Sequence, residues 1–220
     1  MAAGEVHDMI IVGAGISGIG SAYHLKTQNP DKTFAILEAK DNIGGTWDTH
    51  KYPGVRSDSD LYTFGYRFKP WVGPPIATAE EIRKYLRDVL AENDLGSAIR
   101  FGTLITRCSW STADKLWTVE TRKADGSAGP TYRANFLWMC QGYYDHKTPY
   151  IPDWAGMDRY KGQFVHAQLW DPKTDVSGKH VIVIGSGATA ATIVPALCDA
   201  GAKVTMVQRS PTWFYCAPNV

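Results

Sequence analysis

One glycine-rich pattern occurs twice in this 220-residue chain, and each time it follows a short apolar run. The first copy is Ile10-Ile11-Val12-Gly13-Ala14-Gly15-Ile16-Ser17-Gly18, and the second is Val181-Ile182-Val183-Ile184-Gly185-Ser186-Gly187-Ala188-Thr189-Ala190. A buried strand that turns through closely spaced glycines into a helix is typical of a βαβ unit that binds a dinucleotide. The repeat therefore predicts an α/β chain with two nucleotide sites, for two redox cofactors or for one cofactor and one hydride donor.

The first glycine pattern has the full context that dinucleotide binding requires. The elements expected around it are a strand, a helix and a second strand, over residues 8–12, 16–28 and 33–38. Glu38 lies 20 residues past Gly18 (38 − 18 = 20), where the fingerprint places the acid that binds a ribose. Gly13 allows a tight turn, Gly15 lets a pyrophosphate approach the backbone, and Gly18 lets helix and strand pack closely.

Features beyond the second strand favour FAD over NAD at this first site. Gly44-Gly45-Thr46-Trp47 follows the strand, so two residues without side chains precede a flat aromatic ring. Residues 41–75 are rich in glycine, proline and aromatics with little periodicity, and a loop of that length is usually functional. We expect FAD to contact Gly13, Gly15, Ser17, Gly18, Glu38, Gly45, Thr46 and Trp47.

The second glycine pattern has Ala190 where the first has Gly18, a replacement that the fingerprint tolerates. When the second strands are superposed, the acid at 38 becomes Gln208, and Arg209 follows it. Removing the carboxylate relieves repulsion toward a 2′-phosphate, and a guanidinium can bind that phosphate through two hydrogen bonds. The pattern therefore predicts NADPH here, in contact with Gly185, Ser186, Gly187, Ala188, Thr189, Arg209 and Ser210.

Between the two patterns the sequence predicts an amphipathic helix and an antiparallel insertion. Residues 78–93 repeat apolar side chains at helical spacing, and Thr78 with Glu81 forms a capping-box pattern at the start. Three runs expected as strands follow, over residues 101–110, 116–122 and 131–140. The polar turn between the last two favours an antiparallel meander inserted between parallel strands.

The composition excludes several other classes of function. Lysine plus arginine number 23 and aspartate plus glutamate 22, which gives no electrostatic basis for binding nucleic acid or an anionic membrane. The four cysteines form no CxxC pair and have no histidine cluster, so we expect free thiols in a reducing compartment and no metal site. Since the sequence has no signal-peptide pattern and no apolar run long enough for a membrane span, we expect a cytoplasmic protein.

A third motif lies between the two glycine patterns and indicates a family. It meets the fingerprint F-x-G-x-x-x-H-x-x-x-W, followed by proline or aspartate, at Gly162, His166, Trp170 and Asp171, with Tyr160 in place of the usual phenylalanine. With all three motifs in order, the chain resembles the class B flavoprotein monooxygenases, in particular their Baeyer–Villiger branch. Residues 44–71 and 183–197 look especially like the subgroup of the ethionamide-activating monooxygenase. In the family, the fingerprint histidine and tryptophan support the linker between domains.

The resemblance implies a monooxygenase that uses FAD, NADPH and O2. In the family, NADPH reduces FAD, and the reduced flavin reacts with O2 to give a C4a-peroxyflavin. That species inserts one oxygen atom beside a ketone carbonyl or transfers it to sulfur, so the implied substrate is a small ketone or thioether. By the same resemblance, Asp58 is the candidate catalytic residue beside flavin and nicotinamide. Trp47 and Tyr62 match flavin-pocket positions, and the backbone of Ile105 falls at the adenine end.

These observations combine into one expected architecture. We expect an FAD-binding Rossmann-type domain with an inserted antiparallel β-meander over residues 1–145, a linker with the fingerprint over 146–175, and the start of an NADP-binding Rossmann-type domain over 176–220. Family members are considerably longer, and the family's active-site arginine has no counterpart here. The chain is therefore expected to be a fragment, a relic, or one half of an enzyme whose C-terminal half is a second chain, and to be inactive alone. The rival interpretations are a flavin-containing S/N-monooxygenase and a non-catalytic nucleotide-binding subunit.

Overall fold

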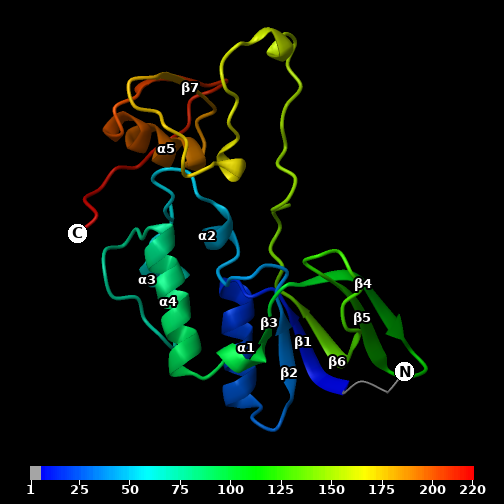
Figure 1. Cartoon of the computed structure of the whole chain (residues 1–220). Coiled ribbons are helices and arrows are strands. Elements are labelled where there is room, and N and C mark those ends of the chain that lie inside the picture. The colour runs from blue at the N-terminus through cyan, green and yellow to red at the C-terminus, as the bar shows by residue number, and fades with distance from the viewer. Residues whose placement is uncertain (1–5) are drawn as a thin grey trace. The chain divides into compact units, whose positions relative to one another are not determined.

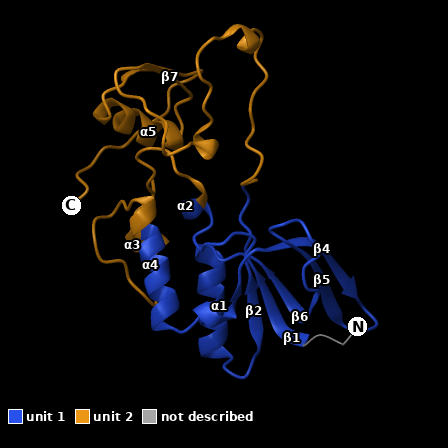
Figure 2. Ribbon diagram, viewed as in Figure 1, with its two compact units in different colours: residues 1–48, 82–144 blue, residues 49–81, 145–220 orange. Residues whose placement is uncertain are grey.

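A computed structural model describes residues 6–220, which form two compact units that each contain one glycine pattern (Figures 1 and 2). Unit 1 comprises residues up to 48 together with 82–144, and unit 2 comprises residues 49–81 together with 145–220. Within the described range, no helix is both long and apolar enough to cross a membrane. The division into functional domains expected from the sequence stays a prediction.

Unit 1 is built on a six-stranded sheet with the strand order β3-β2-β1-β6-β5-β4. Its elements, in chain order, are β1 (Val6–Val12), α1 (Ile16–Gln28), β2 (Phe34–Leu37), α2 (Thr46–Thr49), α4 (Ala79–Glu92), η1 (Gly96–Ala98), β3 (Ile99–Arg100), β4 (Thr103–Ser111), β5 (Leu116–Lys123) and β6 (Tyr132–Met139). Strands β3, β2, β1 and β6 pair in parallel, whereas β6, β5 and β4 pair antiparallel. This arrangement confirms the predicted α/β fold with an antiparallel meander inserted between parallel strands.

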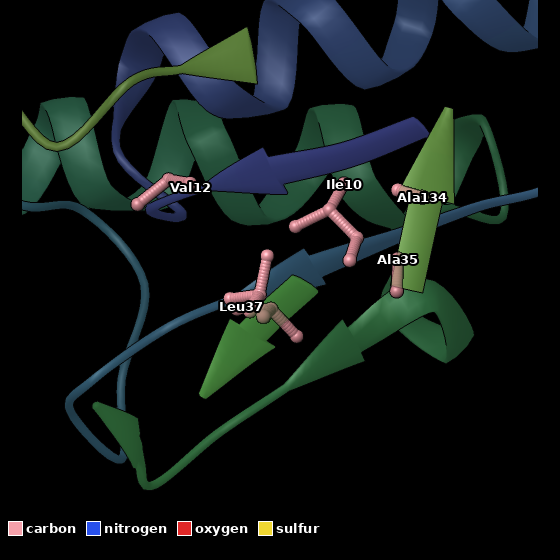
Figure 3. Packing of buried hydrophobic residues seen from close by; sticks show 6 residues of the cluster. Ile10, Val12, Ala35, Leu37 and Ala134 are labelled. Atoms are coloured by element: carbon pink, nitrogen blue, oxygen red, sulfur yellow. The ribbon is translucent and has the colours of Figure 1, made fainter. Parts of the chain in front are cut away.

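The apolar runs of β1 and β2 explain why Ile10–Val12 and Ala35–Leu37 are buried on both faces of these two strands. One face packs against the meander in a cluster formed by Ile10, Val12, Ala35, Leu37, Val119 and Ala134 (Figure 3). Ile11 and Ile36 alternate with these residues, point to the opposite face and are fully buried. Helix α1 contacts both strands. Strands buried on both faces need continuous apolar sequences, and that need accounts for the runs that precede Gly13 and Glu38.

Helix α4 begins with the predicted capping box. The backbone N–H of Thr78 donates to Glu81 Oε2 at 2.7 Å, and the N–H of Glu81 donates to Thr78 Oγ1 at 3.3 Å. The two reciprocal bonds satisfy backbone donors that have no partner inside the helix. The predicted apolar face is also present, since its members are buried: Ile82, Tyr85, Leu86 and Val89.

The structure differs from the sequence prediction within residues 41–75, which were expected to lack regular structure. This stretch contains two one-turn helices, α2 and α3 (Leu61–Phe64). The side chain of Asp60 caps α3 by accepting the N–H of Thr63 at 2.8 Å. A four-residue helix is too short to show a repeating apolar pattern, so hydrophobic periodicity could not reveal either one.

Unit 2 contains a smaller βαβ unit with a core of its own. Its elements are α3, η2 (Met157–Arg159), η3 (Ala167–Leu169), β7 (His180–Ile184), α5 (Ala188–Asp199) and β8 (Lys203–Val207), and β7 pairs with β8 in parallel. Tyr52 and Trp170, which are 8% and 9% exposed, pack against Ile193 and Leu197 of α5. The two sequence segments of unit 2 therefore share one apolar core.

Gly54 brings the loop that carries Tyr52 into direct contact with α5. Its φ is +77°, and an added Cβ would lie 2.5 Å from the carbonyl oxygen of Thr192 and 2.9 Å from Ala196 Cβ. Both the backbone conformation and the available space require glycine at this position. Packing of the loop on the helix therefore depends on this residue.

Gly54→Ala is expected to destabilise unit 2 by about 2–5 kcal/mol, because a left-handed alanine costs about 1–2 kcal/mol and overpacking about 1–3. Gly178→Ala is the matched control, since Gly178 has a φ of +69° and no neighbouring atom within 4 Å of an added Cβ. The free energy of unfolding of the control should fall only by the cost of a left-handed alanine, about 1–2 kcal/mol. Urea unfolding followed by tryptophan fluorescence measures both. Equal losses would contradict the close approach of Gly54 to α5.

Candidate functional site

The turn between β1 and α1 needs its three glycines for three different reasons. Gly13 has a φ of +96°, and an added Cβ would lie 2.8 Å from the carbonyl oxygen of Cys140. At Gly18 an added Cβ would overlap the Gly13 carbonyl oxygen, so the glycine sets the close packing of α1 on β1. Gly15 has a φ of −80°, open to any residue, and an added Cβ would meet only Gly45, at 3.8 Å. Protein packing therefore does not require glycine at 15, and the free space suits a ligand that approaches the backbone.

Glu38 lies beside this turn at the end of β2. The carbonyl of Leu37 accepts the N–H of Gly13 at 2.8 Å, which brings the residue after Leu37 next to the glycines. Glu38 is 6% exposed, and its two carboxylate oxygens accept the N–H groups of Ala14 at 2.8 Å and Lys40 at 2.9 Å. A carboxylate can accept about four hydrogen bonds, so acceptor capacity remains for a ligand. The sequence indicated the acid but gave no sign that it also holds the glycine turn.

A second pair of glycines packs on the first turn. The N–H of Gly44 donates to the carbonyl of Ala14 at 3.0 Å, and an added Cβ on Gly45 would lie 3.4 Å from Gly15 Cα. The φ values of Gly44 and Gly45 are +115° and +55°. Helix α2 starts directly afterwards, with Trp47 half-buried. Unit 1 thus brings together the residues predicted to hold the first cofactor: Gly13, Gly15, Ser17, Gly18, Glu38, Gly45, Thr46 and Trp47.

The N-terminus of α1 suits an anionic group. Gly15 is the N-cap residue, no side chain caps the helix, and the first turn contains no acidic residue. Backbone N–H groups and the positive end of the helix dipole meet at this point. The same holds for α5, which begins after Gly187 without a side-chain cap or an acid in its first turn.

A charged cluster that no sequence motif indicated lies beside the second pair of glycines. The side chain of Asp48 is 9% exposed, and its oxygens contact Lys40 Nζ at 2.6 Å and Arg83 Nη1 at 3.3 Å. Lys40 Nζ also donates to the carbonyl of Gly45 at 3.4 Å. Lys40 follows β2, Asp48 is in α2 and Arg83 is in α4, so the three residues have no regular spacing in the sequence. No sequence pattern could therefore have revealed the cluster.

The second βαβ unit repeats the backbone geometry of the first. The N–H of Gly185 donates to the carbonyl of Val207 at 2.8 Å, just as Gly13 donates to Leu37. This register places Gln208 at the position of Glu38. Gly187 has a φ of −81°, and an added Cβ would have no neighbour within 4 Å. Like Gly15, it leaves space that protein atoms do not fill.

The residues predicted to bind a 2′-phosphate follow β8 on an exposed segment. Arg209 and Ser210 are both exposed, as are Ala188 and Thr189 in the first turn of α5. Ser186 is buried, and its hydroxyl contacts Thr212 Oγ1 at 2.8 Å and donates to the carbonyl of Ser210 at 3.3 Å. The glycine turn and the segment after β8 are thereby tied together, and the guanidinium of Arg209 faces solvent.

Other predicted residues lie outside these two turns. Asp58 and Tyr62 belong to unit 2 and are exposed, and Tyr62 Oη donates to the carbonyl of Gly73 at 2.7 Å. The side chain of Ile105 packs against the core cluster of unit 1, next to a register shift in the pairing of β4 with β5. Their roles at a cofactor stay predictions.

The fingerprint residues take part in packing and local hydrogen bonds. Trp170 is part of the unit 2 core, and His166 Nδ1 accepts the N–H of Gln168 at 3.2 Å at the start of η3. An added Cβ on Gly162 would overlap the ring of Tyr160, so the glycine admits that ring. These contacts agree with the structural role that the resemblance implies for the motif.

The thiol beside the first turn is not poised as a nucleophile. Cys140 follows β6, and its Sγ lies 3.6 Å from the hydroxyl of Ser21. Burial raises the pKa of the Cys140 thiol above its usual value, and the Ser21 contact opposes this shift only in part. The thiol form therefore dominates at neutral pH. All four cysteines are free thiols.

Comparison with known proteins identifies the family. Residues 10–219 match the family described as pyridine nucleotide-disulphide oxidoreductase, and the chain belongs to it. The probable FAD-binding monooxygenase AlmA of Acinetobacter baylyi is 47% identical over 215 residues, which are 97% of this chain and 43% of the relative. The FAD-containing monooxygenase EthA of Mycobacterium tuberculosis is 45% identical over 214 residues, 96% of this chain and 43% of that protein. The chain thus spans less than half the length of these relatives.

Solved structures give the same result. OTEMO in complex with FAD and NADP has a TM-score of 0.79 at 30% identity, over 96% of this chain and 40% of that chain. An oxidized steroid monooxygenase bound to NADP has a TM-score of 0.79 at 30% identity, over 95% and 40%. Cyclohexanone monooxygenase in an open crystal structure has a TM-score of 0.80 at 27% identity, over 94% and 40%. The comparisons confirm the predicted resemblance to flavoprotein monooxygenases of the Baeyer–Villiger branch.

The different roles of Gly15 and Gly18 lead to opposite expectations for their alanine variants. Gly18→Ala should lower the free energy of unfolding by about 1–3 kcal/mol, because its Cβ overlaps the Gly13 carbonyl. Gly15→Ala should change it by less than about 0.5 kcal/mol, because its Cβ meets no close neighbour. Denaturant unfolding without added nucleotide tests both. A Gly15→Ala loss as large as that of Gly18→Ala would mean that glycine 15 serves the fold and not a ligand.

Proposed function

We propose that this chain is the cofactor-binding part of an NADPH- and FAD-dependent monooxygenase. The reaction transfers one oxygen atom of O2 to a small ketone, or to the sulfur of a thioether, while the other oxygen atom leaves as water and NADPH supplies two electrons. One observation carries the proposal. Gly15, at the N-terminus of α1, leaves space beside the buried carboxylate of Glu38 that packing does not explain. The names of the relatives, which are FAD-binding or FAD-containing monooxygenases, support FAD as the occupant.

The residues of unit 1 have the chemistry that a flavin dinucleotide requires. The N-terminus of α1 would hold the pyrophosphate, and Glu38 would accept hydrogen bonds from the ribose. Gly44 and Gly45 would let the dinucleotide approach the backbone, with the ring of Trp47 beside it. Bound FAD supplies the redox chemistry, and these residues bind and orient it. Asp58 is proposed to act beside the flavin and the nicotinamide.

The residues of unit 2 would hold NADPH in a matching way. The N-terminus of α5 suits a second pyrophosphate, and Gln208 replaces the acid that would repel a 2′-phosphate. Arg209 is exposed and follows Gln208 directly, so its guanidinium is available for that phosphate. Ser210, tied to Ser186, would add a hydroxyl.

The proposal is tested in two stages. The chain is incubated with FAD and passed through gel filtration, and the absorption spectrum reports flavin that stays bound. NADPH is then added without oxygen, and loss of the flavin absorption reports hydride transfer. With oxygen admitted, product is assayed from a cyclic ketone and from a thioether. A chain that retains no flavin contradicts the FAD site. Flavin reduction without product is expected of the chain alone, so the assay is repeated with the C-terminal half supplied as a second chain, and a lack of product even then favours a non-catalytic nucleotide-binding role.

Glu38→Gln is expected to weaken FAD binding roughly ten- to a hundredfold, because a hydrogen bond to a charged acceptor contributes about 1.5–3 kcal/mol. The amide keeps the shape of the side chain and its oxygen can still accept the N–H of Ala14, while its NH2 group cannot accept the N–H of Lys40. Glu120→Gln, on the exposed side of β5, is the control and should bind FAD as the wild type does. Titration of apoprotein with FAD, followed by flavin fluorescence, gives both dissociation constants. Equal affinity in Glu38→Gln would remove this residue from the site.

Arg209→Ala is expected to weaken NADPH binding roughly ten- to a hundredfold and to leave NADH binding nearly unchanged, since only the 2′-phosphate contact is lost. Lys203→Ala removes a cation from the opposite end of β8 and is the control for general charge effects. Isothermal titration with each nucleotide provides the comparison. If Arg209→Ala weakens NADPH and NADH to the same degree, Arg209 does not select the phosphate.

A further inference from the structure

Asp48 contacts three separate parts of unit 1. Its carboxylate contacts Lys40, which follows β2, and Arg83, which comes from α4. Its own backbone N–H donates to the carbonyl of Gly45 at 3.1 Å. Asp48 therefore lies where the turn at Gly44 and Gly45, the end of β2 and helix α4 meet.

The turn held by Asp48 has little rigidity of its own. Gly44 and Gly45 both have positive φ values, and glycine loses more conformational freedom on ordering than any other residue. Lys40 reaches the Gly45 carbonyl at 3.4 Å and Asp48 at 2.6 Å with the same ammonium group. The ion pair between Lys40 and Asp48 is thus bonded directly to Gly45. The Cα of Gly45 would lie 3.8 Å from a Cβ added to Gly15.

The same contacts lead from the turn to Glu38. The N–H of Lys40 donates to Glu38 Oε1, and Glu38 Oε2 accepts the N–H of Ala14. A continuous series of hydrogen bonds and ion pairs therefore joins Arg83, Asp48, Lys40 and Glu38. One end is anchored in a fourteen-residue helix, and the other holds the glycine turn.

We propose that Asp48 is a positioning residue for the dinucleotide held by unit 1. It fixes the Gly44–Gly45 turn and, through Lys40, the carboxylate of Glu38 in the geometry that binds the cofactor. This inference rests on the proposed FAD site. It assigns to the site three residues, Lys40, Asp48 and Arg83, that the glycine fingerprint does not contain.

Removing the charge of Asp48 changes FAD affinity in opposite directions if Asp48 positions the turn and if it acts only by Coulomb interaction with the cofactor. Asp48 places a negative charge between the positive charges of Lys40 and Arg83. Removing the negative charge would make the cluster more attractive to a diphosphate and would tighten binding if Coulomb attraction alone mattered. If Asp48 holds the turn in place, removing its charge weakens binding instead.

The test compares FAD binding by the wild-type chain, Asp48→Asn and Asp88→Asn. Asp88 is in α4, as Arg83 is, and pairs with Lys84 at 2.6 Å, but that pair is exposed, so Asp88→Asn removes an equal charge without touching the turn. We expect Asp48→Asn to raise the FAD dissociation constant about tenfold or more and to change the visible circular dichroism of bound flavin at saturation. Asp88→Asn should change neither.

Each outcome decides the matter. Unchanged or tighter FAD binding by folded Asp48→Asn overturns the positioning role, while the proposed FAD site stands. A wild-type chain that binds no FAD overturns the site and this inference together. If Asp48→Asn does not fold, Arg83→Gln replaces it, because Asp48 then keeps Lys40 as a partner. Loss of this positive charge weakens FAD binding under either explanation, so the flavin dichroism at saturation decides: Arg83→Gln should alter it, and a wild-type spectrum would overturn the role.

Discussion

The approach of Gly18 to the carbonyl of Gly13 is the contact on which unit 1 depends. No side chain fits between them, so α1 starts directly against the end of β1. That closeness brings the helix N-terminus to the same edge of the sheet where β2 ends at Leu37. Glu38 then reaches the N–H of Ala14, and Gly44 reaches the carbonyl of Ala14. A larger residue at 18 would separate the helix from the strand and disperse the groups that could hold a nucleotide.

In both βαβ units the glycine turn is bonded to the segment that follows the second strand, but different side chains make the bonds. In unit 1 the residue after β2 is an acid that bonds to the glycine turn through a backbone N–H. In unit 2 the corresponding Gln208 has no such role, and the turn uses the hydroxyl of Ser186 to hold Ser210 and Thr212. The carboxylate is thus absent where a 2′-phosphate is proposed to bind, and a different bond keeps the turn in place. Because the backbone register is the same in both units, the two turns differ mainly in the charge of the residue after the second strand, which is Glu38 in unit 1 and Gln208 in unit 2.

The sequence predicted those parts of the fold that have a local pattern of apolar side chains. The strands before Gly13 and Gly185 are continuous apolar runs, and the capped helix from Thr78 repeats apolar residues at helical spacing. These elements and the meander are present within a few residues of the expected ends. Asp48 could not be found in this way, because its partners come from β2 and α4 at unrelated spacings. The one-turn helices α2 and α3 were missed for a similar reason, since four residues contain no repeat.

Trp170 belongs to the fingerprint motif and is also a buried residue of the unit 2 core. The fingerprint was recognised as a pattern with a family meaning, and the structure gives its tryptophan a physical partner in Tyr52. The loop of Tyr52 is held on α5 by Gly54, so the segment at 49–81 and the fingerprint segment are parts of one core. Both aromatic residues pack on α5, which begins at Ala188. The burial of the helix that follows the second glycine turn therefore involves residues more than a hundred positions earlier in the chain, which local sequence patterns do not reveal.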